Sequence, residues 1–157
     1  MTTKWVDWGS RPDHQRPEWQ AIGRGAHQAC FDYQASRLFP PGDIPASFHH
    51  AFAYGHTGVF IMDIRSERTA GEGGQLFSPK QEQDLRAFLR ANRDRKLLLL
   101  LLSVPIIHLP RFLARLMHKL PFSGEDFADR WSSGAHIRDR DRLLHLLHDH
   151  QRCHPGQ

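Results

Sequence analysis

The chain has few cysteines and no apolar segment of membrane-spanning length. Only Cys30 and Cys153 occur among its 157 residues, which excludes a disulfide framework and favours a reducing compartment. The longest apolar run covers residues 97–102, far short of the roughly 20 residues that a transmembrane helix needs. The first residues contain no apolar signal core. We therefore expect a cytoplasmic chain that has no membrane partner.

Recognisable catalytic motifs are absent as well. The sequence has no phosphate loop of the Walker type, no Gly-x-Ser-x-Gly nucleophile elbow and no His-Glu-x-x-His pair. Its two cysteines lack the spacing of metal ligands. Motifs alone therefore assign no catalytic constellation to this chain.

A continuous basic stripe is also missing, although the formal net charge is +4 and twelve histidines add positive charge below neutral pH. Basic residues are mixed with acids, as in residues 139–142, Asp-Arg-Asp-Arg. This mixing argues against nucleic-acid binding, whereas a small anionic substrate remains compatible with the charge. The length and the 39% apolar content suit a single folded domain over residues 1–157.

The most distinctive segment that is present is the leucine run at residues 96–105, Lys-Leu-Leu-Leu-Leu-Leu-Leu-Ser-Val-Pro. An apolar run without alternation predicts an inner strand of a layered α/β sheet, covered on both faces. Leucine also favours helices, so a buried helix is the alternative. Pro105 and the charged residues 93–96 limit the length of the segment and favour the strand.

A hairpin and a crossover helix are predicted before the leucine strand. Residues 48–54 alternate in polarity, residues 58–65 are rich in β-branched side chains, and a glycine-bounded link joins the two. Ser78 can cap a following helix, with Pro79 in the first turn and Gln81 completing a capping box. The strand–helix–strand order predicts a right-handed crossover and parallel pairing of residues 59–64 with 97–102. The fold class is therefore α/β, with a mixed sheet packed by helices.

Three further helices are predicted from apolar residues at a period near 3.6. They cover residues 17–38, a segment that begins at Pro110, and residues 137–150. Residues 1–17 contain two tryptophans among glycine and prolines, with a third just beyond at Trp19, and are expected to be an irregular segment held by aromatic burial.

Asp63 and Arg65 are the catalytic candidates. They follow the second hairpin strand, where α/β sheets usually place ligands. The alternative is that they pair with each other or with neighbours. The final helix carries several potential metal ligands, but one helix cannot complete a coordination sphere, so we expect them to be exposed: His145, His148, Asp149, His150, Cys153 and His154.

The order of several segments resembles an alkaline phosphatase D-like (PhoD-like) metallophosphatase over residues 8–150. The segments are "DWGSRP", "FIMDIRSERT", "LFSPKQEQDLRAFL", "LLLLLLSVPI" and "DRWSSGAHIRDRDRLLHLL". The resemblance implies a metallophosphatase-type α/β sandwich. It also implies hydrolysis of phosphate mono- or diesters by a two-metal centre of manganese, iron, calcium or zinc.

The family's metal-ligand motifs are not found in this sequence. Asp7 lies close to one of them in order but does not match a ligand position, so no ligand can be carried over. We therefore expect a partial sandwich that holds no metal or other cofactor and is inactive alone, with metals and a phosphoester substrate only in a full-length member. The alternative is a non-catalytic α/β binding or interaction module. Self-association through an exposed sheet or the tryptophan-rich start is expected of the partial sandwich.

Overall fold

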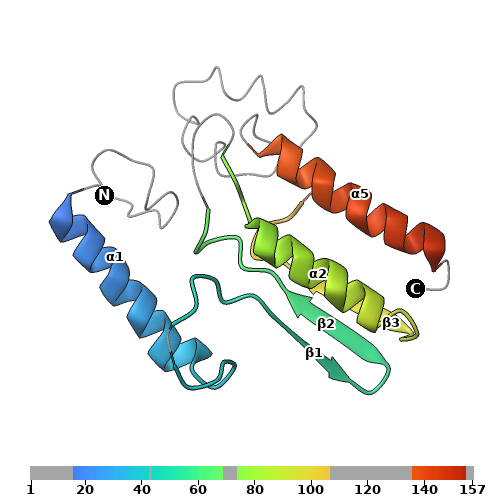
Figure 1. Cartoon of the computed structure of the whole chain (residues 1–157), viewed down its shortest axis with the longest axis horizontal. Helices are drawn as coiled ribbons and strands as arrows, with labels where there is room; N and C mark the ends of the chain where they lie inside the picture. The colour runs from blue at the N-terminus through green and yellow to red at the C-terminus, as the bar shows by residue number, and fades with distance from the viewer. Residues whose placement is uncertain (1–15, 43, 69–73, 107–135, 155–157) are drawn as a thin grey trace.

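The computed structural model describes residues 16–42, 44–68, 74–106 and 136–154 (Figure 1). A mixed three-stranded sheet has the order β1-β2-β3. In Figure 1, α1 lies on one side of the strands, and α2 and α5 lie together on the other. The described part of the chain is thus α/β, as its pattern predicts. The elements are α1 (Pro17–Cys30), β1 (His50–Tyr54), β2 (Thr57–Ile61), α2 (Pro79–Ala91), β3 (Leu97–Leu101) and α5 (Ile137–Cys153).

The predicted hairpin is confirmed, with shorter strands. β1 and β2 are antiparallel, and Tyr54 lies opposite Thr57. Gly55 has φ +56, a left-handed conformation that glycine adopts without strain, and this allows the tight turn. β2 ends at Ile61 instead of residue 65, so Asp63 lies beyond the strand. The carboxylate of Asp63 binds the backbone of the next residues and turns the chain away from the sheet.

The predicted crossover is also confirmed. β2 and β3 are parallel, and Val59 lies opposite Leu99. The helix between them, α2, begins as expected, with the Ser78 hydroxyl accepting a hydrogen bond from the Gln81 amide at 3.3 Å. Gly58 permits close packing here, because a Cβ at this position would lie 2.9 Å from Leu98 and 3.1 Å from Phe88.

The hydrophobic core fills the space between the sheet, α2 and α5. Its side chains come from β2, the segments around it and the apolar faces of both helices, which the 3.6-residue period predicts. α5 runs three residues beyond the predicted end, to Cys153. The buried cluster comprises Phe60, Met62, Ile64, Leu76, Phe77, Leu85, Phe88, Leu89, Leu143 and Leu146.

The leucine strand is covered on one face only, so the expectation of burial on both faces is wrong in the described part of the chain. Leu98 and Leu100 pack against the core. Leu97, Leu99 and Leu101 are 47%, 40% and 47% exposed. Strand register places two exposed aromatic residues of β1 on the same side of the sheet. We call this side the open face, defined by Phe52, Tyr54, Leu97, Leu99 and Leu101.

α1 is shorter than the predicted helix over residues 17–38. It ends at Cys30 and continues as a π-helical turn over Phe31–Ala35, in which Ser36 N–H donates to Phe31 O at 2.7 Å. No residue of α1 is buried, and Ile22 is 54% exposed. Apolar spacing therefore identified the helix, although its apolar side is not packed into the core.

Several predicted features lie outside the described residues. They include most of the tryptophan-rich start with Asp7 and the helix expected from Pro110. Among the helices that the structure describes, none is long and apolar enough to cross a membrane.

Candidate functional site

Asp63 lies just beyond the carboxyl end of β2 and is the best-anchored polar residue of the region. Its Oδ2 accepts from the Phe48 amide at 2.8 Å. Its Oδ1 accepts from the amides of Arg65 at 2.9 Å and Ser66 at 3.0 Å. The Asp63 side chain thus joins the segment before β1 to the turn after β2, and the predicted alternative of pairing with neighbours describes it correctly.

The backbone of Asp63 is held by Gln81 of α2. Asp63 N–H donates to Gln81 Oε1 at 2.8 Å, and Gln81 Nε2 donates to Asp63 O at 2.9 Å. The Gln81 side chain is fully buried. It therefore does not complete the predicted capping box, because a buried amide is better satisfied by a backbone donor and acceptor together.

The environment of Asp63 keeps its carboxyl ionised. Burial raises the pKa of Asp63, but hydrogen bonds from the Ser66 hydroxyl and from the amides of Phe48, Ser66 and Arg65 outweigh it, so the pKa lies below its usual value. A carboxylate with a low pKa and most of its lone pairs occupied is a poor general base. Asp63 is therefore best described as a structural anion that shapes the strand end.

Arg65 differs from Asp63 because its side chain is exposed and uncommitted. Within the described residues, its guanidinium forms no hydrogen bond or ion pair. It lines a cleft of about 1380 Å³ between α1 and the carboxyl ends of the strands, together with Asp63 and Ser103. This is where α/β sheets place ligands, so the predicted position of a site at Arg65 coincides with an open space.

The opposite wall of the cleft is formed by α1. Gln20, Arg24 and His27 line it from positions i, i+4 and i+7, which share one helical face. The His27 ring stacks on Phe48 at a centroid distance of 4.6 Å. Arg24 and His27 belong to no sequence motif, and only their helical spacing groups them on one face.

A row of hydrogen bonds connects the side chains of Ser47, His49 and Asp84. Ser47 Oγ lies 2.9 Å from His49 Nδ1, and His49 Nε2 lies 2.9 Å from Asp84 Oδ2. The order is that of a catalytic triad, but Ser47 is only 6% exposed and does not line the cleft. These hydrogen bonds therefore connect the segment before β1 to α2. His50 lines the cleft instead, so the two adjacent histidines point to opposite sides.

A charged network links α2 to α5. Glu82 pairs with Arg86 on its own helix and with Arg142 of α5. Arg142 also contacts Asp139, which accepts a hydrogen bond from the Leu76 amide at 2.7 Å. Burial raises the pKa of Glu82, but the hydrogen bonds and charges of Arg86 and Arg142 lower it by more, so the pKa lies below its usual value. These contacts are structural, because they lie away from the cleft-lining residues.

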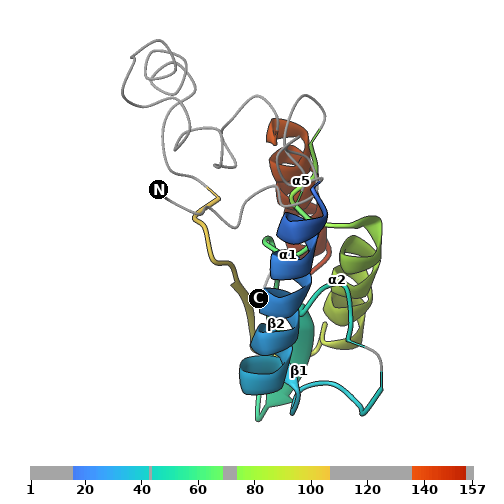
Figure 2. The ribbon, with the colours of Figure 1, turned by 90° about the vertical axis from the view of Figure 1, so that its left-hand side faces the viewer.

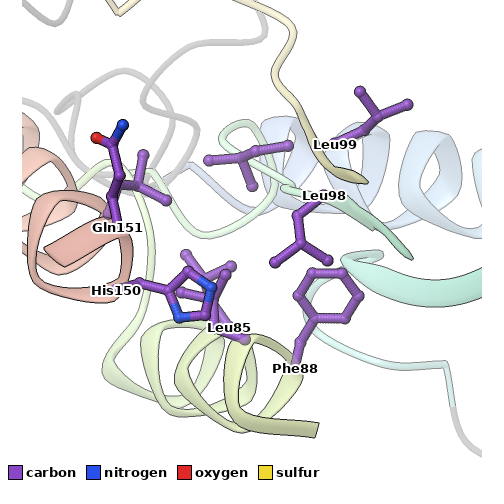
Figure 3. Close-up of a pocket in the computed structure, with 9 residues that line it drawn as sticks. Leu85, Phe88, Leu98, Leu99, His150 and Gln151 are labelled. Carbon is purple, nitrogen blue, oxygen red and sulfur yellow. The ribbon is translucent and has the colours of Figure 1, made fainter. Parts of the chain in front are cut away.

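The histidines of α5 do not gather into a metal site in the described part of the chain, where no three His, Cys, Asp or Glu side chains are grouped to hold an ion. His145 and His148 are exposed. His150 borders a small apolar pocket of about 190 Å³ between α2, β3 and α5. Figure 3 shows Leu98 pointing toward Phe88 in this pocket and Leu99 pointing away.

Comparison with known proteins gives no relative on which to base an assignment. No protein-family model matches the chain, and neither the curated proteins nor the solved structures contain a significant match. The fold and the site thus define an α/β protein with an open, cation-lined cleft at the carboxyl end of its parallel strand pair.

Proposed function

We propose that the cleft binds a phosphate ester, as the substrate-binding part of a phosphoesterase-type α/β sandwich. The observation that carries the proposal is the uncommitted guanidinium of Arg65 just beyond the carboxyl end of β2. Guanidinium groups match phosphate oxygens with paired, charge-assisted hydrogen bonds. This proposal accords with the PhoD-like resemblance, which implies a phosphoester substrate.

The charge of the cleft supports an anionic ligand. Arg24 and Arg65 both line it, and neither guanidinium pairs with another residue in the described ranges. Asp63 is the one carboxylate among the lining residues that the structure describes, and three backbone amides already bind it. Phe48 and Ile61 add apolar surface, which suits the organic part of an ester.

The proposal assigns binding to this chain and not hydrolysis by the chain alone. Two-metal hydrolysis needs several carboxylates and histidines from separate strand ends, and the PhoD-like ligand motifs are not present in the sequence. Divalent metals belong to the proposal only for a full-length member of such a family.

Binding is tested by titrating the chain with phenyl phosphate in a calorimeter. Arg65→Ala is expected to weaken binding by about 10-fold or more, because a hydrogen bond to a charged group contributes about 1.5–3 kcal/mol. Arg90→Ala is the matched control, since Arg90 is an exposed arginine on α2 outside the cleft. Equal affinities of the parent and Arg65→Ala would contradict the proposal.

Catalysis is tested separately with a chromogenic phosphodiester in the presence of manganese or calcium. We expect no turnover above that of the heat-denatured chain. Turnover well above this control would show that the chain holds a working centre by itself, which would overturn the non-catalytic part of the proposal.

An interaction module is the second candidate function. The observation that favours it is the open face, where five large apolar side chains are between 40% and 84% exposed. Contiguous apolar surface of this kind commonly marks a protein–protein contact.

A further inference from the structure

In the described part of the chain, β3 forms one edge of the sheet and lacks the features that protect edge strands. Its five residues, Leu97–Leu101, include no charge and no proline, and they form a regular ladder with β2. Figure 2 shows this strand, coloured yellow-brown, at the side of the sheet. An apolar, regular edge is a template for another strand.

The hydrogen-bonding direction of β3 fixes which backbone groups face outward. Met62 N–H donates to Leu101 O at 3.0 Å, and Leu97 N–H donates to His56 O at 3.3 Å, so these residues face β2. Because the direction alternates along a strand, the N–H and C=O groups of Leu98 and Leu100 face away from the sheet. The outer edge therefore offers two donors and two acceptors within three residues.

We propose that two copies of the chain pair through β3, antiparallel, about a two-fold axis at Leu99. Leu98 of each copy then exchanges both backbone hydrogen bonds with Leu100 of the other. The same two-fold axis places Leu99 of one copy opposite Leu99 of the other, and Leu97 of one copy opposite Leu101 of the other, on the open face. The surface is thus self-complementary, which an isologous dimer requires. This interface uses no residue that the phosphate ester is proposed to bind.

The charges beside β3 select the antiparallel arrangement. Arg93, Arg95 and Lys96 precede the strand, with Asp94 as the one acid among them. Parallel pairing would bring the two basic segments together, whereas antiparallel pairing sets them at opposite ends of the interface. The like charges therefore do not oppose each other in the proposed dimer.

The helix side of the edge also accommodates a second copy. The apolar pocket of about 190 Å³ is lined by Leu98, Leu100 and Leu147 and lies along β3 (Figure 3). It exceeds the roughly 150 Å³ of an apolar cavity that holds a benzene-sized group. In the antiparallel pair, Leu100 of the second copy stands beside Leu98 on this side of the sheet. The pocket thus has room for an aliphatic side chain from the added strand.

Cysteine cross-linking tests the register of the pair. In a chain with Cys30→Ser and Cys153→Ser, Leu99→Cys is expected to form an intermolecular disulfide, because non-hydrogen-bonded antiparallel partners lie close together. Leu97→Cys is the matched control on the same face, since residue 97 of one copy would lie about 13 Å from residue 97 of the other along the strands. Mixing Leu97→Cys with Leu101→Cys is expected to restore cross-linking.

Two further measurements use the chain without cysteine probes. Sedimentation of the parent is expected to show a monomer–dimer equilibrium, and the amides of Leu98 and Leu100 are expected to exchange more slowly as concentration rises. Leu99→Lys should shift the equilibrium to monomer by like-charge repulsion across the axis, whereas Tyr54→Lys on β1 should not. A parent that stays monomeric, or cross-linking of Leu97→Cys equal to that of Leu99→Cys, would overturn the proposal.

Discussion

Gln81 and Asp63 form a joint between α2 and β2 that neither residue suggests by its sequence position. Ser78-x-x-Gln81 fits a capping box, and Asp63 fits the end of a strand in an active site. In the folded chain, Gln81 binds both backbone groups of Asp63, and the Asp63 carboxylate binds three amides. Side chains that satisfy buried backbone groups leave little capacity for chemistry.

Replacing Gln81 by alanine should lower the free energy of unfolding by about 2–4 kcal/mol, because it removes the partner of both the N–H and the C=O of Asp63, which are partly buried. Urea unfolding followed by circular dichroism measures the loss. Gln83→Ala is the control, since Gln83 is an exposed residue of the same helix and should change stability by less than about 0.5 kcal/mol. Similar losses in both variants would show that the joint does not contribute.

At the scale of the element, the leucines of β3 lie in two different environments. All its residues are leucine, yet alternate side chains face the core and the open face. A continuous apolar run predicted the strand and its parallel pairing correctly. It could not predict that one face lacks cover, because cover depends on where the helices dock.

Leu100→Asp and Leu99→Asp should therefore differ, although the sequence suggests the same outcome for both. Leu100 packs against the core, and a charge there lacks a partner. We therefore expect the free energy of unfolding to fall by roughly several kcal/mol and the chain to unfold. Leu99 is 40% exposed, so an aspartate there keeps contact with water and should be tolerated. Thermal melts at low protein concentration compare the two. Equal destabilisation would contradict the one-sided burial of β3.

At the scale of the whole molecule, three carboxylates with lowered pKa values each connect separate segments. Asp63 joins the segment before β1 to the turn after β2, Glu82 joins α2 to α5, and Asp84 joins α2 to the segment before β1. Asp84 accepts from Lys80 and from His49, and these hydrogen bonds lower its pKa despite the opposing effect of burial. All three pKa values lie below their usual values of 3.8 for aspartate and 4.5 for glutamate. Folding thus favours the ionised form of each.

A lowered pKa in the folded state means that the stabilisation is present above the unfolded-state pKa and is lost as the pH falls. We therefore expect the free energy of unfolding to stay nearly constant between about pH 7 and pH 5 and to fall as the pH drops below about 4.5. Urea unfolding across this range measures it. Asp63→Asn should be less stable than the parent at neutral pH, by a difference that shrinks on acidification. A difference independent of pH would count against ionised Asp63 as the cause.

The sequence by itself determined where most of the described helices and strands lie, although not all of their ends, together with the hairpin, the parallel crossover and the Ser78 cap, because periodicity, turn residues and caps act over a few neighbouring positions. It also placed Arg65 at the strand end that borders the cleft. Only the tertiary structure decided that Gln81 binds Asp63, that Arg24 and His27 face the cleft, and that β3 keeps an open face. These features join residues far apart in the chain, and their partners are set by how the layers pack, which no local pattern encodes.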